Sequence, residues 1–349
     1  MPLARPVNPP LDPAATALAR TFAGARARIV PLAGDASGKR FFRVRGRTRS
    51  AVLMINPEPL SASSPLLTNH RILETIRAPV PKILAIDEPS GSILYKDFGD
   101  LTLQKRLVPA LPRGRRSGKR SGHAPIGIWR RFYLQAIDLI VLLQSKGAAA
   151  IRTDDFAARH ALDKERFLFE LDHFHRHFVR GLRRFRPSQP DEALLRAFYA
   201  DLAGACDAMP RVYCHRDYMS RNLMVVRGGL GLIDYQDARM GPYTYDPASL
   251  LRDSSLLFEE DFVQEMVACL AQRLDQGIEE FRLDFDIVGL ERNIKELGTF
   301  AFLASERGMK GYLEFVPRAA ASVRRTMRRY PAYDRIYSIF DRILPPEIR

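Results

Sequence analysis

Three polar residues near the middle of the chain have types and spacing suited to one kind of chemistry. Asp217 follows His215 and Arg216, Asn222 comes five residues later, and Asp234 comes twelve residues after that. A carboxylate such as Asp217 can accept or orient the proton of an attacking hydroxyl group. An amide and a second carboxylate supply oxygen ligands for Mg²⁺, which takes oxygen ligands and keeps several waters. The set therefore predicts transfer of a phosphoryl group from a nucleotide.

The elements expected around these residues would bring them together. The apolar segments 223–226 and 230–233 predict a β-hairpin with a Gly-rich turn, which puts Asn222 and Asp234 at the same end. Arg216 completes a His-Arg-Asp string whose distance from the asparagine is that of a kinase catalytic loop. The alternative is that the loop residues only cap a turn and the second aspartate only ends a strand. The complete set at this spacing favours catalysis.

Length and composition limit the class of protein. The chain has 349 residues, of which 46% are hydrophobic, enough for a large core and two lobes. No run approaches the roughly 18 apolar residues of a membrane span, and the Pro-rich residues 1–13 contain no apolar segment of a secretory signal. Three unclustered cysteines argue against a disulfide framework or a zinc site. We therefore expect a cytoplasmic protein with no membrane partner.

The formal net charge of +14 concentrates in two basic stretches, residues 113–120 and 324–329. The first lies in an insertion at about 108–127, rich in Gly, Ser and Pro, which cannot bury enough apolar surface to order itself. Nucleic-acid binding would be indicated by interleaved aromatic residues or by a named motif, and neither accompanies the charge. We interpret the insertion as solvated and flexible, and we do not expect nucleic acid as a partner.

The pattern of apolar residues changes near residue 100. Before it, β-strands are predicted at 41–44, 51–55, 82–87 and 92–95, and helices at 11–24 and 66–77. After it, helical spacing predicts helices at 129–145, 164–183 and 191–207, and three or four more between 259 and 329. The sequence therefore predicts an α+β, bilobal protein-kinase-like fold. Its strand-rich N-lobe would span residues 1–100 and its mainly helical C-lobe residues 101–349.

A glycine-rich segment near the N-terminus invites comparison with a P-loop. Only three residues separate Gly34 from Gly38, and Arg40 stands where a Ser or Thr should ligate Mg²⁺. A strand at 41–44 follows, not the helix that a P-loop requires. The segment instead predicts the phosphate-covering hairpin of kinases, in which Lys39 or Arg40 supplies the positive charge.

Several longer strings resemble the aminoglycoside phosphotransferase-like kinases. The most specific are residues 215–224, 234–238 and 241–246. Within that family the chain is most similar to the anomeric N-acetylmuramate/N-acetylglucosamine kinases of cell-wall recycling. That narrower likeness rests on residues 35–37, Arg40, Arg43, 96–100, 251–253 and 290–298. The resemblance covers roughly residues 29–317.

The resemblance implies ATP and Mg²⁺ as cofactors, and transfer of the γ-phosphoryl group to the anomeric hydroxyl of a small-molecule sugar. By position, Asp217 would be the base, assisted by Arg216, and Asn222 and Asp234 would be the metal ligands. Nucleotide contacts are expected from Asp35, Ser37, Lys39, Arg40 and Asp97. Sugar contacts are expected from Glu170, Gln236, Asp237, Arg252, Asp253 and Arg292. For Glu170, Arg252, Asp253 and Arg292, the alternative is an ordinary ion pair on a helix surface.

Three features depart from the family pattern. The strand 51–55 lacks the lysine that usually pairs with the α- and β-phosphates, and Ile55 stands where the related sugar kinases tend to carry Asp. Lys96 occupies the hinge, where an acidic or polar residue is commoner, and the insertion matches no family pattern. Two alternatives therefore stay open: a related kinase for an aminoglycoside or other alcohol, and a nucleotide-binding pseudokinase with a basic surface. The sequence indicates no oligomeric state.

Two positions carry alternatives that geometry can decide. Asp246 lies at the start of a helix, where it either caps that helix or braces the catalytic loop. Arg40 and Arg43 lie three residues apart on one strand, so their side chains should point to opposite faces. We expect Arg40 to face the nucleotide phosphates and Arg43 to face away from them. The alternative is that both are solvated arginines of the hairpin.

Overall fold

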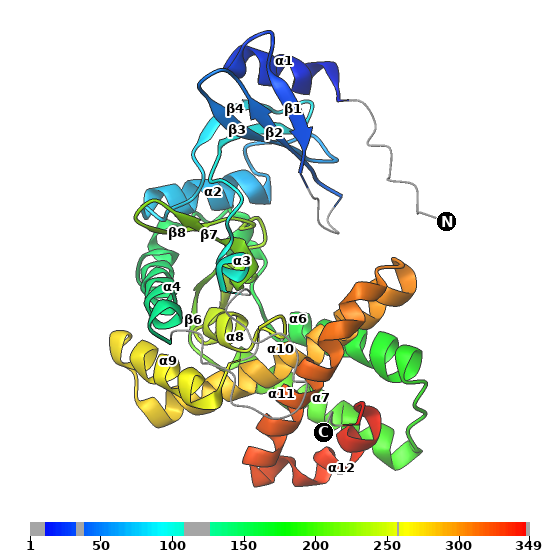
Figure 1. Cartoon of the computed structure of the whole chain (residues 1–349). Helices are drawn as coiled ribbons and strands as arrows, with labels where there is room; N and C mark the ends of the chain where they lie inside the picture. The colour runs from blue at the N-terminus through cyan, green and yellow to red at the C-terminus, as the bar shows by residue number, and fades with distance from the viewer. Residues whose placement is uncertain (1–10, 33–37, 108–125, 257, 347–349) are drawn as a thin grey trace, which may run out of the picture.

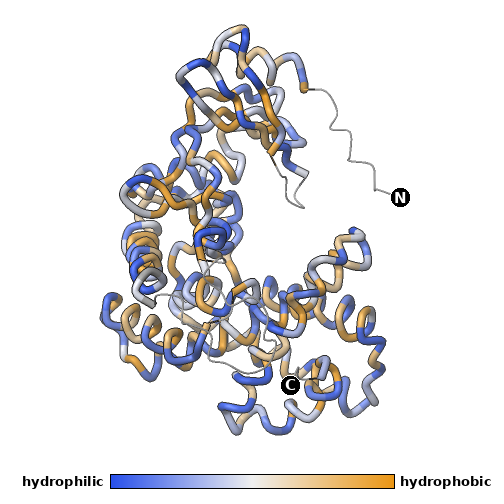
Figure 2. Tube along the Cα trace, in the orientation of Figure 1, coloured by the Kyte–Doolittle hydropathy of each residue, from blue (hydrophilic) through white to orange (hydrophobic). Residues whose placement is uncertain are grey.

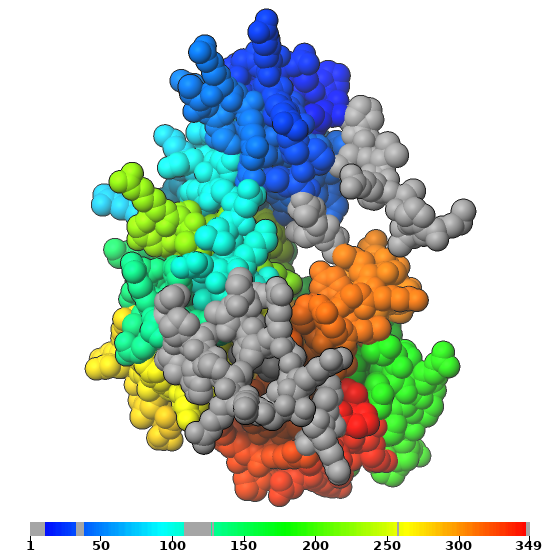
Figure 3. Space-filling view, in the orientation of Figure 1, coloured from blue at the N-terminus to red at the C-terminus, as the bar shows by residue number. Residues whose placement is uncertain are grey.

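The computed structural model describes residues 11–32, 38–107, 126–256 and 258–346. A small lobe built on an antiparallel sheet lies above a larger, mainly helical lobe (Figure 1), which confirms the predicted bilobal α+β fold. In the space-filling view the outline is notched between the blue small lobe and the orange end of the large lobe (Figure 3). Asp35, Ser37 and residues 108–125 of the basic insertion lie outside the described residues.

The small lobe contains a five-stranded sheet in the order β1-β2-β3-β5-β4, with antiparallel pairing throughout. Its elements are α1 (Pro13–Ala23), β1 (Arg28–Pro31), β2 (Arg40–Arg45), β3 (Ser50–Ile55), β4 (Ile83–Asp87) and β5 (Ser92–Lys96). The strands predicted from alternating apolar residues are confirmed to within about one residue at each end. Figure 2 shows hydrophobic and hydrophilic residues alternating along the chain of this lobe.

The two faces of the sheet bury different neighbours. Phe42, Leu53 and Leu94 lie on the outer face, in one apolar cluster with helix α1. Phe41 and Met54, which are partners in the β2–β3 register, lie on the inner face toward the large lobe. Because side chains alternate along a strand, this register decides which residues of β2 can reach a ligand between the lobes.

The large lobe is mainly helical. Helix α2 (Pro65–Thr75), between β3 and β4 in the chain, belongs to the small lobe and lies next to the large one. The helices and the π-helical or 3₁₀ segments of the large lobe are α3 (Leu103–Leu107), α4 (Ile126–Lys146), η2 (Ala148–Ala150), α5 (Phe156–Arg159), α6 (Lys164–Phe174), η3 (His175–Leu182), α7 (Gln189–Asp207), η4 (Ser220–Asn222), α8 (Tyr245–Leu251), α9 (Glu260–Arg273), α10 (Ile278–Glu306), η5 (Lys310–Phe315), α11 (Val316–Arg329), η6 (Pro331–Tyr333) and α12 (Asp334–Ile343). The helix predicted at 164–183 is α-helical only as far as Phe174 and then continues as the π-helical segment η3. No helix of the described chain is both long and apolar enough to cross a membrane.

Local sequence explains where several helices begin. Pro65 occupies the start of α2, where its missing N–H would have no intrahelical partner in any case. The Asp163 carboxylate caps α6 by accepting the backbone N–H of Arg166 at 2.9 Å. The Ser188 hydroxyl caps α7 in the same way, at 3.3 Å from the backbone N of Asp191.

Helix α10 runs through the centre of the large lobe (Figure 1) and is buried along most of its 29 residues. Gly298 allows α10 to approach α6 closely, since a Cβ at this position would lie 2.6 Å from the Cα of Phe174. The close approach brings polar residues of the two helices together beside the catalytic loop.

Two short antiparallel ladders hold residues 211–242, which we call the catalytic segment. β6 (Arg211–Cys214) pairs with β9 (Arg239–Pro242), and β7 (Leu223–Val226) pairs with β8 (Gly229–Leu232). Gly228 forms the turn of the second hairpin at φ 94°, a conformation that glycine adopts without steric cost. The predicted hairpin is confirmed, with its second strand displaced by one residue.

Arg252 lies at the end of α8 and is the centre of a buried ion-pair network. Its guanidinium is bonded to both oxygens of Glu260, at 2.7 and 2.9 Å, and to Asp286 at 3.2 Å. Asp286 is 1% exposed and is also bonded by Arg329 at 2.7 Å and by the hydroxyl of Tyr330 at 2.9 Å. The placement of Arg252 therefore does not support the expected sugar contact, because these carboxylates already occupy both terminal nitrogens of its guanidinium.

The basic stretch 324–329 on α11 is largely compensated within the fold. Arg324, Arg325 and Arg329 form ion pairs with carboxylates of α12, α9 and α10 respectively. These charges therefore join α11 to its neighbours, which weakens the case for a basic binding surface at this stretch.

We expect Arg252→Ala to lower the free energy of unfolding by roughly 2–3 kcal/mol, because it leaves a buried carboxylate with fewer partners. The matched control is Arg273→Ala, which breaks an ion pair with Asp138 whose side chains are 33% and 62% exposed. That change should cost less than about 1 kcal/mol. Urea unfolding of both variants measures the difference, and equal losses would contradict a structural role for Arg252.

Candidate active site

The catalytic loop is held by the carboxylate of Asp246. Its two oxygens accept the backbone N–H groups of His215 at 2.7 Å and of Arg216 at 2.9 Å. Asp246 is 1% exposed, and burial raises its pKa to about 6 although these bonds and the His215 side chain oppose the rise. Its side chain therefore braces the catalytic loop, and Thr244 occupies the N-cap position of α8.

Asn222 and Asp234 come together at the open end of the β7–β8 hairpin. The Asn222 amide nitrogen donates to the backbone carbonyl of Asp217 at 2.8 Å and lies 3.4 Å from Oδ2 of Asp234. The backbone carbonyl of Asn222 accepts the N–H of Ile233 at 3.1 Å, which closes the ladder. The three residues identified by their spacing therefore lie in one place.

Two residues of this segment have left-handed backbone conformations. Arg216 has φ 73° and Asp234 has φ 68°. For residues other than glycine such conformations cost on the order of 1–3 kcal/mol and persist where the surroundings fix them, often at functional sites. The hydrogen bonds from Asp246 hold the backbone at Arg216. Contacts from helix α2, described below, hold the residues that follow Asp234.

Positive side chains surround Asp217. Burial alone would raise the pKa of its carboxyl, but the charges of Arg216, Lys295 and Arg292 outweigh burial and hold the pKa below its ordinary value. Asp217 is therefore ionised at neutral pH, the state in which a carboxylate accepts a hydrogen bond from a hydroxyl group.

Glu170, on α6, joins two helices to the catalytic loop. Its Oε1 lies 3.1 Å from Nε of Arg166, 3.1 Å from Nζ of Lys295 and 3.5 Å from a terminal nitrogen of Arg216. Glu170 is 3% exposed, and its Oε2 has no hydrogen-bond partner among the described residues. Burial would raise the pKa of Glu170, but the three cations together lower it.

Lys295 is absent from the residues predicted from the sequence. It lies three positions after Arg292 on α10, and therefore on the same side of that helix, which is the signal that could have revealed it. Its Nζ contacts the hydroxyl of Tyr245 at 2.9 Å. Lys295 and Arg292 thus bring two positive charges of α10 to the side where Asp217 lies.

Arg292 and Asp237 both lie close to residues of the catalytic loop. The guanidinium of Arg292 is stacked over the ring of Tyr245 at 4.8 Å, and its NH1 has no hydrogen-bond partner in the described parts of the chain. Asp237 pairs with Arg216 at 3.2 Å and with Arg239 at 3.0 Å, and its side chain is 38% exposed. Both residues were expected to contact a sugar, and both lie beside the predicted base.

Gln236 and Asp253 have different surroundings. The amide of Gln236 donates to Oδ1 of Asp234 at 3.0 Å, so Gln236 lies next to the predicted metal ligand. Asp253 is 4% exposed and accepts from the hydroxyl of Ser220 at 3.4 Å and from the backbone N of Ser255 at 2.8 Å. These contacts give Asp253 a role in holding the end of α8 against the loop.

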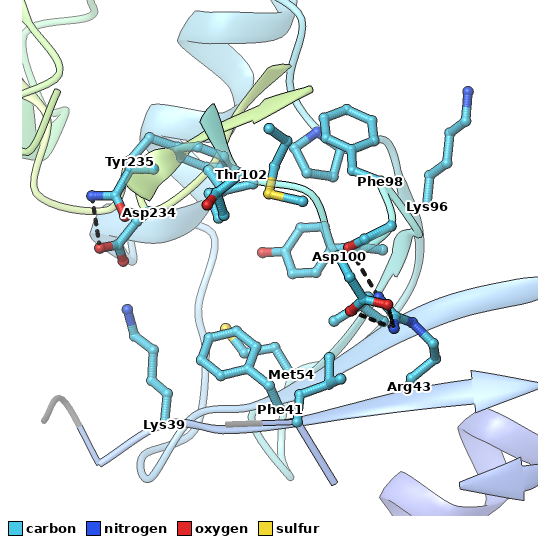
Figure 4. A pocket seen from close by; sticks show the side chains of 18 of the residues that line it. Lys39, Phe41, Arg43, Met54, Lys96, Phe98, Asp100, Thr102, Asp234 and Tyr235 are labelled. Carbon is cyan, nitrogen blue, oxygen red and sulfur yellow. Dashed lines mark hydrogen bonds and ion pairs between the residues drawn. The ribbon is translucent and has the colours of Figure 1, made fainter. Parts of the chain in front are cut away.

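A cavity of about 380 Å³ opens between the inner face of the sheet and the catalytic segment (Figure 4). Its walls are largely apolar, and three polar residues of the catalytic segment, Asn222, Asp234 and Gln236, line it as well. The lining includes Leu32, Lys39, Phe41, Val52, Met54, Leu66, Tyr95, Phe98, Asn222, Asp234 and Gln236. An apolar cavity with a few convergent polar groups is the usual form of a small-molecule site.

Lys39 and Arg40 lie on opposite sides of the sheet. Lys39 lines the cavity and points toward Asp234 (Figure 4). Burial raises the pKa of the Asp234 carboxyl, and the charge of Lys39 opposes that rise. Arg40 is the register partner of Ile55 on the outer face, and its guanidinium lies 5.7 Å from the ring of Phe42. The expectation that Arg40 faces the cavity is therefore not supported, and Lys39 occupies that side instead.

Arg43 also lines the cavity, contrary to expectation, but its guanidinium is occupied. It donates to Asp97 at 2.8 Å, to Asp100 at 2.6 Å and to the carbonyl of Gly99 at 2.9 Å. Asp97 also accepts a bond from the hydroxyl of Ser50. These bonds fix the linker between the lobes against β2, so Asp97 holds the linker and is not itself part of the cavity wall.

Curated relatives match most of the chain. It is 28% identical over 323 residues to the N-acetylmuramate/N-acetylglucosamine kinase of Neisseria meningitidis serogroup B, with 90% of each chain covered. It is 29% identical over 314 residues to the protein of the same name from Pseudomonas aeruginosa, covering 84% of this chain and 81% of the other.

Solved structures and a family model agree on the fold. A choline/ethanolamine kinase family protein from Mesorhizobium loti superposes with a TM-score of 0.59 at 12% identity, covering 95% of this chain and 98% of that one. An ADP-bound aminoglycoside phosphotransferase gives a TM-score of 0.55 at 13% identity, covering 90% and 99%. The model of the phosphotransferase enzyme family matches residues 28–283. The chain therefore belongs to the phosphotransferase enzyme family.

Proposed function

We propose that the protein is an ATP-dependent sugar kinase that phosphorylates the anomeric hydroxyl of N-acetylmuramate, N-acetylglucosamine or both. The observation that carries the proposal is the meeting of Asp217, Asn222 and Asp234 beside the cavity, in the order and spacing that phosphoryl transfer uses. The names of the curated relatives supply the sugar. A cytoplasmic location and a lobe boundary near residue 100 belong to the same proposal.

In this proposal the cavity holds ATP, and Asn222 and Asp234, which line it, hold Mg²⁺. The donor set fits, because kinases bind Mg²⁺ through one or two side-chain oxygens together with substrate phosphates. When bound, Mg²⁺ neutralises phosphate charge during transfer. Asn222 and Asp234 would hold it, and Lys39 would contact phosphate oxygens.

The acceptor sugar would lie against the polar cluster around Asp217. The buried polar atoms there that have no hydrogen-bond partner within the described chain include Oε2 of Glu170, Nε of Arg216 and NH1 of Arg292. Buried polar groups are rarely left without partners, so these atoms are suited to the hydroxyl and amide groups of a sugar. The guanidinium of Arg292 also suits a carboxylate, which it would bind through two parallel bonds.

In this arrangement the chain contributes position and charge. Asp217 would accept the hydrogen bond of the attacking hydroxyl and so orient its oxygen toward the transferred phosphoryl group. The cations near it, Arg216, Lys295 and Arg292, keep that carboxylate ionised. Preorganised charge of this kind accounts for most of the rate enhancement in phosphoryl transfer.

Phosphorus NMR of the purified protein with ATP, Mg²⁺ and each amino sugar tests the proposal. We expect an anomeric phosphate signal with at least one of the two sugars. Asp217→Asn should lower kcat by roughly 10²–10⁴-fold, the contribution of a positioned base, without lowering the unfolding midpoint. The control Asp138→Asn changes a side chain that is 62% exposed and should leave kcat unchanged. Turnover only on another alcohol would contradict the proposed sugar substrate. An unchanged kcat in Asp217→Asn would contradict the proposed role of Asp217 as the base.

Lys39→Ala should raise the KM for ATP roughly 10-fold, since a charge-assisted contact to phosphate contributes about 1.4 kcal/mol or more. Arg40→Ala is the matched control, because Arg40 is the next residue in the chain and its side chain lies on the opposite face of the sheet from the cavity. It should change the KM less than about 2-fold. Steady-state kinetics at saturating sugar measure both values. A larger effect from Arg40→Ala would reverse the assignment.

A further inference from the structure

Helix α2 is tied to the chain that follows the predicted metal ligand Asp234. The side chain of Asn69 on α2 is fully buried, and its amide nitrogen donates to the backbone carbonyl of Gln236 at 3.0 Å and to that of Ala238 at 2.9 Å. Its carbonyl oxygen accepts from the hydroxyl of Tyr213 at 3.0 Å. The amide orientation of Asn69 is therefore fixed, because its nitrogen, which can only donate, faces the two backbone carbonyls and its oxygen, which can only accept, faces the tyrosine hydroxyl.

A second bond from the same helix reaches the same segment. Nδ1 of His70, the next residue of α2, lies 2.7 Å from the hydroxyl of Tyr235, and the two rings are 5.7 Å apart. Gln236, whose carbonyl Asn69 holds, bonds the carboxylate of Asp234 through its own side chain at 3.0 Å. The residues that follow Asp234 are therefore held from one side by α2.

These contacts act where the backbone needs support. Asp234 has φ 68°, an unfavourable conformation for an aspartate that must be imposed by its surroundings. Without Asn69, the carbonyls of Gln236 and Ala238 would lose the amide that donates to them, and a buried carbonyl left without a donor is unfavourable. Relaxation of this turn would displace the carboxylate of Asp234 from its place beside Asn222.

The usual coupling between the small-lobe helix and the nucleotide site is absent from the described residues. In protein kinases a lysine on the third strand pairs with a glutamate on the helix. Here β3 presents Val52 and Met54 to the cavity. The acidic residue of α2 is Glu74, which pairs with His70 at 3.3 Å and is 51% exposed.

We propose that Asn69 is a positioning residue for the metal site: its amide fixes the turn after Asp234 and couples α2 to metal binding in place of a lysine–glutamate pair. The inference rests on the proposed role of Asp234 as a metal ligand. Groups that orient metal ligands typically contribute 10–100-fold to metal affinity, which gives the size of the effect to measure.

Arg71 provides a matched control on the same helix. It also bonds α2 to the large lobe, through the carboxylate of Asp155 and the carbonyl of Ala150 at 3.2 Å. Neither partner belongs to the segment after Asp234. Arg71→Met therefore weakens the attachment of the helix without removing a bond to the turn.

The experiment measures Mn²⁺ binding to the protein–ADP complex by electron paramagnetic resonance, together with the Mg²⁺ dependence of the rate. We expect Asn69→Ser to weaken Mn²⁺ binding on the order of 10-fold, to raise the Mg²⁺ concentration for half-maximal rate similarly, and to leave the KM for the sugar unchanged. Tyr213→Phe, which removes one bond to Asn69 and keeps its ring, should shift metal affinity in the same direction by less. Arg71→Met should leave metal affinity within about 2-fold of wild type and lower only the unfolding midpoint.

Three results would overturn the inference. Wild-type metal affinity in folded Asn69→Ser would do so, as would an equal loss of metal affinity in Arg71→Met. If Asn69→Ser does not fold, the Tyr213→Phe variant becomes the test. Wild-type metal affinity in Tyr213→Phe would then overturn the proposal. Failure of the wild-type complex to bind Mn²⁺ would instead remove the proposed metal site itself, and this inference with it.

Discussion

The two hydrogen bonds from the Asp246 carboxylate to the catalytic loop are the interaction on which the rest of the site depends. They reach the backbone N–H groups of His215 and Arg216 from a helix that begins thirty residues later in the chain. Because Asp246 is buried, no water competes for these bonds. They support the left-handed backbone at Arg216, and the chain that leaves it presents Asp217.

From that fixed point the other polar residues are placed by successive packing contacts. The β7–β8 hairpin returns the chain so that Asn222 meets Asp234. Gly298 permits the close approach of α10 to α6, which puts Lys295 within 3.1 Å of Glu170. The resulting cluster is buried and highly charged, an arrangement that is costly for stability and is therefore expected where charge must be preorganised for a reaction.

Local patterns in the sequence were sufficient to predict the fold and to predict that Asp217, Asn222 and Asp234 lie close together. The hairpin at residues 223–232 and the strands of the small lobe follow from alternation and turn residues, which act over a few positions. The prediction that Arg40 faces the cavity was wrong. Side chains alternate along a strand, so an error of one residue in the register places a side chain on the opposite face. The cavity side of β2 carries Phe41 and Arg43, as the register with β3 decides, and Lys39 lines the cavity just before the strand begins.

Other roles depend on partners far away in the sequence. Arg252 was expected at the sugar because it lies near a family motif, but Glu260 and Asp286 reach it from two other helices. Asn69 gives no local signal at all, since a single polar residue in an amphipathic helix is ordinary until its partners at 236 and 238 are known. Long-range hydrogen bonds of this kind are visible only in the folded chain.

A crystal structure of the ternary complex with a non-hydrolysable ATP analogue, Mg²⁺ and N-acetylmuramate would test the central claim most directly. We predict Mg²⁺ coordinated by Asn222 and Asp234, and the anomeric oxygen of the sugar within about 3 Å of the Asp217 carboxylate, as a base in hydrogen-bond reach requires. A sugar bound with its anomeric oxygen away from Asp217, or a metal held by other residues, would contradict the proposed mechanism.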